Sequence, residues 1–272
     1  MVFNYKIDAK MKTINSKTVV FVTGAFVSHK GWDHWKEYFE SKGYTTLAPA
    51  WPHKDGTVSE LRDRQPNDVD LANVRFADVV NHYAEIIKQL PEKPILIGHS
   101  LGGLTVQKLL ERDLAAAAIA IHSVPPQGVL TFEPSFFKSL WNPLGIFSST
   151  SKTYLMSFKD WQYSFTNGMN LEDQKYSYEI STIPESRKAL RDPLTSTGKI
   201  DLKKPHAPLL FVSGSTDNIM PASLSYSIYK RYKSNSSSVT DYKEFKGHNH
   251  YVLGLPTWRE EADYILDWID KN

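Results

Sequence analysis

The residues with the clearest capacity for chemistry centre on Ser100, within Gly98-His99-Ser100-Leu101-Gly102. A short apolar run, 95–97, precedes this pentapeptide, and residues with helical spacing, 104–110, follow it. A G-x-S-x-G sequence between a strand and a helix holds its serine at a sharp turn, because only residues without side chains let the two elements approach. The turn also places the Leu101 N–H at a helix N-terminus, where an anion is favoured. The pattern predicts a nucleophilic serine, although an ordinary strand-to-helix connection has the same pentapeptide.

A serine hydroxyl becomes a nucleophile only when a base takes its proton and an acid orients that base. On this kind of turn the three groups follow the chain order serine, acid, histidine. Asp217 follows the apolar run 208–213, and His248 and His250 both follow the run 239–245. Each therefore lies at the carboxyl end of a predicted strand, which is the end of a parallel sheet that binds ligands. The sequence predicts a catalytic triad with two candidate histidines.

The elements that must position these residues alternate between strands and helices. Such alternation predicts an α/β fold with a mostly parallel, doubly wound sheet. Residues 2–14 alternate weakly and predict a short edge strand or hairpin, whereas the polar stretch 53–70 predicts an irregular surface excursion. Predicted strands cover 18–23, 44–48, 95–97, 115–121, 208–213 and 239–245, and predicted helices cover 32–39 (closed by Gly43), 79–90, 104–110, 221–232 and 257–269.

The alternating pattern stops at Pro125-Pro126 and resumes near residue 204. The intervening segment is rich in aromatic residues and predicts a helical cap, inserted after the strand that follows the nucleophile helix. We therefore expect a core formed by 1–125 and 204–272 and a cap formed by 126–203. The aromatic rings can form the cap's own core, line an apolar pocket over Ser100, or do both.

At these residues the chain resembles the α/β-hydrolase superfamily over nearly its whole length. Gly98-His99-Ser100-Leu101-Gly102 resembles the family's nucleophile elbow, and Gly214-Ser215-Thr216-Asp217 resembles its acid loop. The family's oxyanion loop often reads His-Gly-X, but here it reads Thr23-Gly24-Ala25, without the histidine that braces the loop. The resemblance implies that the backbone N–H groups of Ala25 and Leu101 stabilise the oxyanion, each by roughly 3 kcal/mol. It makes Ser100 the nucleophile and Asp217 the acid.

The choice between the two histidines rests on the last loop. Gly247-His248 resembles the Gly-His pair that carries the base in many α/β hydrolases. A bacterial group of largely uncharacterised members instead has Gly-Arg-Ser/Thr-His, apolar residues, Gly and a later Trp. The sequence from Gly247 through His250 and Gly254 to Trp258 is similar to that pattern, with His248 in the arginine position. Because an apolar run behind His250 would shield its bond to Asp217, we predict His250 as the base.

Composition excludes several other classes of function. The chain has 272 residues, a formal net charge of +2 and no cysteine. This charge does not indicate nucleic-acid binding, and no apolar stretch approaches the ~20 residues of a membrane span. We expect no cofactor, because no G-x-G-x-x-G follows a strand, and no metal, because the histidines lack ligand spacing. We expect a cytoplasmic protein with a small-molecule substrate, and the sequence leaves its oligomeric state open.

These observations predict a carboxylesterase-like serine hydrolase acting on an ester, thioester or related acyl bond next to an apolar or aromatic group. A perhydrolase of the cofactor-free haloperoxidase type, a C–C hydrolase and a lyase remain alternatives on the same site, because fold does not settle function. A receptor-like protein that binds a ligand without turnover is a further alternative. The candidate pocket-lining residues are Phe26, Trp141, Phe158, Trp161 and Phe165.

Overall fold

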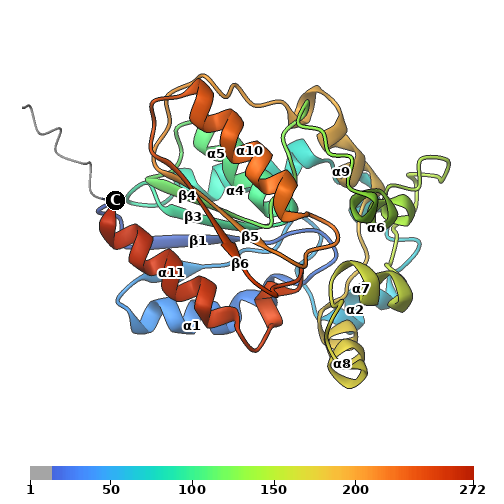
Figure 1. Ribbon diagram of the computed structural model, residues 1–272. Helices are drawn as coiled ribbons and strands as arrows, with labels where there is room; N and C mark the ends of the chain where they lie inside the picture. Colours follow the sequence, from blue (N-terminus) through green and yellow to red (C-terminus); the bar gives the residue numbers. More distant parts are fainter. Residues whose placement is uncertain (1–13) are drawn as a thin grey trace, which may run out of the picture.

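The computed structural model describes residues 14–272 and consists of a central sheet covered by helices (Figure 1). Six parallel strands have the order β2-β1-β3-β4-β5-β6, which confirms the predicted α/β architecture. The short strand or hairpin predicted over 2–14 lies outside the described residues, apart from residue 14 itself. The strands are β1 (Thr18–Val22), β2 (Thr45–Leu47), β3 (Ile95–His99), β4 (Ala117–Ile121), β5 (Leu209–Gly214) and β6 (Thr240–Phe245).

Successive residues of the buried strands pack on opposite faces of the sheet. Val19 and Phe21 of β1 belong to the hydrophobic cluster on the side of α1 (Asp33–Ser41) and α11 (Trp258–Lys271). Val20 and Val22 belong to the cluster on the other side, with α4 (Phe76–Lys88), α5 (Leu101–Glu111) and α10 (Ala222–Asn235). Because side chains of a strand alternate between faces, a sheet covered on both sides requires apolar residues at every position. The apolar run of β1 meets this requirement.

The cap elements lie between β4 and β5 in the sequence and gather at one end of the sheet, on the right in Figure 1. Two antiparallel bridges join Val27 to Thr182 and Tyr154 to Glu185, and the second lies wholly within the segment for which the sequence predicts a helical cap. The first bridge joins the cap to the loop after β1. The boundaries at 126 and 203 remain a prediction. The cap elements are α6 (Pro134–Leu144), α7 (Phe158–Ser164), α8 (Leu171–Ser181), α9 (Arg187–Arg191), η2 (Asp192–Leu194) and η3 (Ser196–Gly198).

The stretch 53–70 is not the irregular excursion that its polar composition predicts. It contains α2 (Val58–Asp63) and the start of α3 (Val69–Asn73). Thr57 and Glu60 form a capping box that begins α2, because each side chain accepts a hydrogen bond from the other's backbone N–H. The same stretch supplies Lys54, whose side chain is buried. Two further 3₁₀ turns are η1 (His29–Trp32) and η4 (Val252–Gly254). No helix in the described part of the chain is long and apolar enough to cross a bilayer.

Candidate active site

Ser100 occupies the turn between β3 and α5 in a strained backbone conformation. Its φ of 58° and ψ of −119° lie outside the regions that L-residues ordinarily adopt. A Cβ on Gly98 would lie 2.2 Å from the Gly102 carbonyl oxygen, and a Cβ on Gly102 would lie 2.1 Å from the Val22 carbonyl oxygen. Neither position accepts a side chain, so the two glycines are what allow β1, β3 and α5 to meet at this turn.

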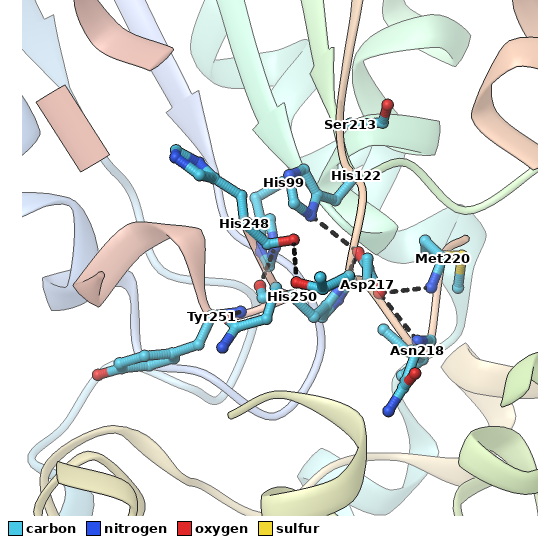
Figure 2. A network of polar contacts seen from close by, with 12 residues as sticks. His99, His122, Ser213, Asp217, Asn218, Met220, His248, His250 and Tyr251 are labelled. Atoms are coloured by element: carbon cyan, nitrogen blue, oxygen red, sulfur yellow. Dashed lines mark hydrogen bonds and ion pairs between the residues drawn. The ribbon is translucent and has the colours of Figure 1, made fainter. Parts of the chain in front are cut away.

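Asp217 and His250 come together from the loops after β5 and β6. The Nδ1 atom of His250 lies 2.7 Å from Oδ2 of Asp217 (Figure 2). The other carboxylate oxygen, Oδ1, accepts the backbone N–H groups of Ile219 at 2.8 Å and Met220 at 2.7 Å. An imidazole that donates from Nδ1 has its lone pair on Nε2. That Nε2 atom is buried and has no hydrogen-bond partner among the described residues, so it is available to accept a proton.

His248, the alternative base, belongs to a different set of contacts. Its Nδ1 atom lies 2.7 Å from Oε1 of Glu261 on α11, and its Nε2 atom lies 3.5 Å from Oε2 of Glu260. Figure 2 shows its ring directed away from Asp217. The structure thus pairs the predicted acid with His250, two residues further along the same loop.

Burial and charge set the protonation of the pair in opposite directions. Burial lowers the pKa of His250 below its ordinary value, although the attraction of Asp217 opposes that change. Burial by itself would raise the pKa of Asp217, but the neighbouring rings of His250 and His122 hold that pKa well below its usual range. At neutral pH the acid is therefore ionised and the base is neutral, as proton abstraction from a serine requires.

The loop after β1 presents backbone N–H groups to the same cavity as Ser100. Ala25 and Leu101 both line that cavity, and neither N–H has an acceptor among residues 14–272. The next N–H along the loop, that of Phe26, already donates to Oε2 of Glu185 at 3.1 Å. Phe26 has a φ of 67°, which turns the loop sharply at this residue. Two unpaired N–H groups that line the same cavity as the serine are the kind of donors from which an oxyanion hole is built.

A buried ion pair from the cap holds this loop in place. Oε2 of Glu185 also lies 2.6 Å from Nζ of Lys54, and both side chains are almost wholly buried. The Lys54 ammonium stands 4.1 Å from the centre of the Trp51 ring, whose indole N–H donates to the Thr23 carbonyl at 2.9 Å. Burial lowers the pKa of Lys54, and Glu185 counteracts that change. A carboxylate from the cap thus anchors the loop that lacks the family's bracing histidine.

Ser100 opens onto an apolar cavity of about 360 Å³ between the sheet and the cap. None of the described residues that line it is charged, and its polar side chains are those of Ser100, Gln127 and Thr131. Apolar contacts come from both parts of the chain. They include Ala25, Phe26, Leu101, Val129, Leu130, Phe136, Phe137, Leu140, Leu144, Phe165, Leu190, Leu194, Ile219 and Met220.

The family of this chain follows from its similarity to known proteins. A model described as the alpha/beta hydrolase family matches residues 19–262, which is most of the chain. The chain belongs to the alpha/beta hydrolase family. A sequence search against curated proteins finds no match.

Solved structures share the fold of this hydrolase at low sequence identity. A methylesterase from Arabidopsis is 18% identical with a TM-score of 0.66, and the match covers 94% of this chain and 99% of that one. A monoacylglycerol lipase from Paleococcus ferrophilus is 21% identical with a TM-score of 0.64, covering 93% and 94%. A pyrethroid hydrolase from Sphingobium faniae is 18% identical with a TM-score of 0.61, covering 93% and 97%.

The structure places the five predicted pocket residues of the hydrolase in three different settings. Phe26 and Phe165 line the cavity at Ser100. Trp141 is 70% exposed and lines a neighbouring hollow that shares α6 as a wall. Trp161 is fully buried, stacks on Phe165 and donates its indole N–H to a serine of α8. Phe158 packs on Tyr178 within the cap, so neither it nor Trp161 reaches the cavity.

The cap's other aromatic residues do not all serve its core or the pocket, which are the two roles that the sequence predicts. Phe132 and Phe147 are 89% and 96% exposed. Phe132 precedes α6 and Phe147 follows it, so both lie on the loops that flank this helix.

Sequence reasoning missed a second partner of Asp217. His122 follows β4 directly, and its Nδ1 atom lies 2.8 Å from the same Oδ2 that His250 contacts. The sequence did place His122 at the carboxyl end of a predicted strand. That position indicated that it lies near the site, because the carboxyl ends of parallel strands lie at the same edge of the sheet. His99 also packs against this group, with Nε2 2.9 Å from the His250 carbonyl oxygen, while His53 is exposed.

Three buried histidines of the hydrolase are the group with metal-ligand chemistry. One ring nitrogen from each of His99, His122 and His250 lies within 4.8 Å of the others. Structural zinc sites need Zn–N distances of about 2.0–2.1 Å. The hydrogen bonds to Asp217 occupy the Nδ1 atoms of His122 and His250, and the Nε2 atoms of both rings have no hydrogen-bond partner among the described residues. The absence of a bound metal therefore stays a prediction.

Proposed function

We propose that this hydrolase cleaves an ester, thioester or related acyl bond through an acyl-enzyme on Ser100. The observation that carries the proposal is the 2.7 Å contact between His250 and Asp217, together with the strained serine turn at an apolar cavity. Each group on its own has an ordinary structural explanation, whereas a serine, a histidine and an acid at one site support the proposal that the serine is activated.

The mechanism follows from the bonding pattern. The Ser100 hydroxyl attacks the acyl carbon while Nε2 of His250 takes its proton, and Asp217 stabilises the resulting imidazolium. The tetrahedral oxyanion accepts hydrogen bonds from the N–H groups of Ala25 and Leu101, and the leaving alcohol or thiol receives the proton from His250. Water then attacks the acyl carbon while His250 takes its proton, and His250 returns that proton to the Ser100 oxygen as the acid is released.

The cavity indicates the substrate class. A charged group would lose its water shell there without a counter-ion, because the lining residues carry no charge. Phe26, Phe165 and the leucines of α6 instead give contact area to an apolar or aromatic group. We therefore propose a small, uncharged substrate with an apolar or aromatic group beside the scissile bond.

Covalent labelling tests the proposal directly. A fluorophosphonate should label the wild-type enzyme at Ser100, and Ser100→Ala should lose both labelling and hydrolysis of p-nitrophenyl esters, with kcat reduced by about 10⁴ or more. Ser123, buried next to the turn at Gly103, provides the control, since Ser123→Ala should still be labelled. Labelling retained in Ser100→Ala would contradict the assignment.

A panel of esters separates the remaining chemistries. Hydrolysis should increase from acetyl to longer or aromatic acyl groups, and it should not depend on hydrogen peroxide. A requirement for peroxide would indicate a perhydrolase. Labelling without turnover of any ester would indicate a ligand-binding protein or a different reaction on the same serine.

A further inference from the structure

A buried chain of acids and histidines extends from the candidate active site to α11. Oδ2 of Asp217 is shared by His250 at 2.7 Å and His122 at 2.8 Å. On its other side, Nε2 of His122 lies 3.4 Å from Oε1 of Glu261. The same Glu261 oxygen contacts Nδ1 of His248 at 2.7 Å. His122, Asp217, His250 and Glu261 have fully buried side chains, so water does not screen these charges.

The position of His122 between two carboxylates favours one protonation state of its imidazole ring. Its Nδ1 atom is hydrogen-bonded to Asp217, and its Nε2 atom lies within ion-pair distance of Glu261 without hydrogen-bond geometry. A carboxylate can only accept a hydrogen bond. A neutral imidazole has one N–H, so its second nitrogen would direct a lone pair at an anion. A protonated ring donates to Asp217, places its positive charge beside Glu261 and so balances one of two buried negative charges. Leaving both acids without a cation in this interior would be costly.

We propose that His122 is a positioning residue that stays protonated in the resting enzyme and sets the basicity of His250 through Asp217. This inference rests on the proposed function for the role of His250 as the base. His122 itself touches neither the substrate cavity nor Ser100 in the described contacts, and it acts through the carboxylate that both rings share.

The charges around His122 come from four elements. Asp217 faces it from the loop after β5, Glu261 from α11, His250 from the loop after β6, and His99 from β3. Burial opposes the charged form of His122, but Glu261 and Asp217 outweigh burial and raise its pKa to about 9. His99 does not compete for the proton, because burial holds its pKa well below the ordinary value.

The effect on His250 has a definite sign. The ring centres of His122 and His250 are 5.9 Å apart, and a positive charge at that distance disfavours a second one. The charge of His122 is among the causes that lower the pKa of His250. His122 therefore keeps the base unprotonated, and available to Ser100, in more acidic solution than an isolated Asp–His pair would allow.

NMR of ¹⁵N-histidine-labelled enzyme tests the protonation state without requiring turnover. At pH 7 both ring nitrogens of His122 should have the shifts of a protonated imidazolium, while His250 should be neutral. A neutral His122 would overturn the proposal even if every variant failed to fold. Because this readout does not need a substrate, it also separates failure of this inference from failure of the proposed hydrolase activity.

The pH dependence of variants tests the coupling. The acid limb is the pH range in which kcat/KM falls as the solution becomes more acidic. In His122→Gln the midpoint of this limb, and the midpoint of the NMR titration of His250, should move up by about one pH unit, since a nearby like charge has been removed. The double variant His122→Gln/Glu261→Gln removes one charge of each sign and so protects the fold. Its limb should move in the same direction, because the lost cation is bonded to Asp217 and lies 5.9 Å from the His250 ring, whereas no contact among the described residues joins Glu261 to either residue.

His248→Gln is the matched control, since His248 contacts Glu261 but is not bonded to Asp217. Its acid limb should stay at the wild-type position. An acid limb that does not move, or moves down, in folded His122→Gln would overturn the proposal. So would an equal upward shift in His248→Gln.

Discussion

The ion pair between Glu185 and Lys54 offers the sharpest test of how this hydrolase holds its oxyanion loop. Oε2 of Glu185 has two tasks, since it accepts the Phe26 N–H at 3.1 Å and pairs with Nζ of Lys54 at 2.6 Å. Glu185→Gln removes the charge that pairs with Lys54 but keeps an amide oxygen that can accept the Phe26 N–H. Glu185→Gln should cost about 3–5 kcal/mol of unfolding free energy, because it leaves the Lys54 charge buried without a partner. That cost is a large part of the 5–15 kcal/mol typical of a domain.

Two double variants separate the charge from the hydrogen bond. Lys54→Met/Glu185→Gln removes both charges but keeps an amide oxygen for the Phe26 N–H. Lys54→Met/Glu185→Leu removes both charges and that acceptor. The glutamine double variant should recover most of the stability lost in Glu185→Gln, because a neutral pair replaces an ion pair of similar volume. The leucine double variant should recover less, because the buried N–H groups of Phe26 and Ser186 lose their acceptors.

Activity should then differ between the two double variants. Without an acceptor, the Phe26 N–H turns toward another partner and displaces the preceding N–H, that of Ala25. Complete loss of one oxyanion donor costs about 10²–10³ in kcat, so partial displacement in the leucine variant should cost about 10- to 100-fold. The glutamine variant should stay within a few fold of the wild type.

The assay combines urea unfolding with ester kinetics for all variants. Glu179→Gln serves as the control, because its bridge to Arg62 joins α8 to α2 nearby but is 67% exposed on the glutamate side. It should change stability by less than about 1 kcal/mol and leave kcat unchanged. Equal kcat values in the two double variants, with both folded, would refute the argument that Glu185 positions the loop.

Two further predictions concern the base. His250→Gln should lower kcat by about 10⁴ while His248→Gln stays active, since only His250 is bonded to Asp217; the reverse result would reassign the base. For the wild type, the acid limb of kcat/KM should lie below pH 6.5, because burial lowers the pKa of His250 and its neutral form is the active one; a limb above pH 6.5 would contradict the burial argument.

The structural features that depend on residues close together in the sequence could be predicted from it. Gly98 and Gly102 flank Ser100 at the spacing that a strained turn requires, and the observed φ of 58° shows that strain. The β-branched residues of β1 predict a strand, and the order of strands and helices predicts a parallel sheet whose carboxyl ends meet at one edge. The apolar run after His250 also indicated which histidine would be shielded, and the structure pairs that residue with Asp217.

The contacts between residues far apart in the sequence, which surround the candidate site, are visible only in the tertiary structure. The bond between His122 and Asp217 spans 95 positions, and that between Lys54 and Glu185 spans 131. A charged residue in a polar stretch is predicted from the sequence to lie on the surface, even when it is buried. The reason is that hydrophobic periodicity indicates which side of an element is apolar, but not which other element packs against it. The cap aromatics divided in the same way, with Phe165 at the cavity, Trp161 behind it and Phe147 in solvent. All three residues are aromatic, and only their packing in the folded protein distinguishes them.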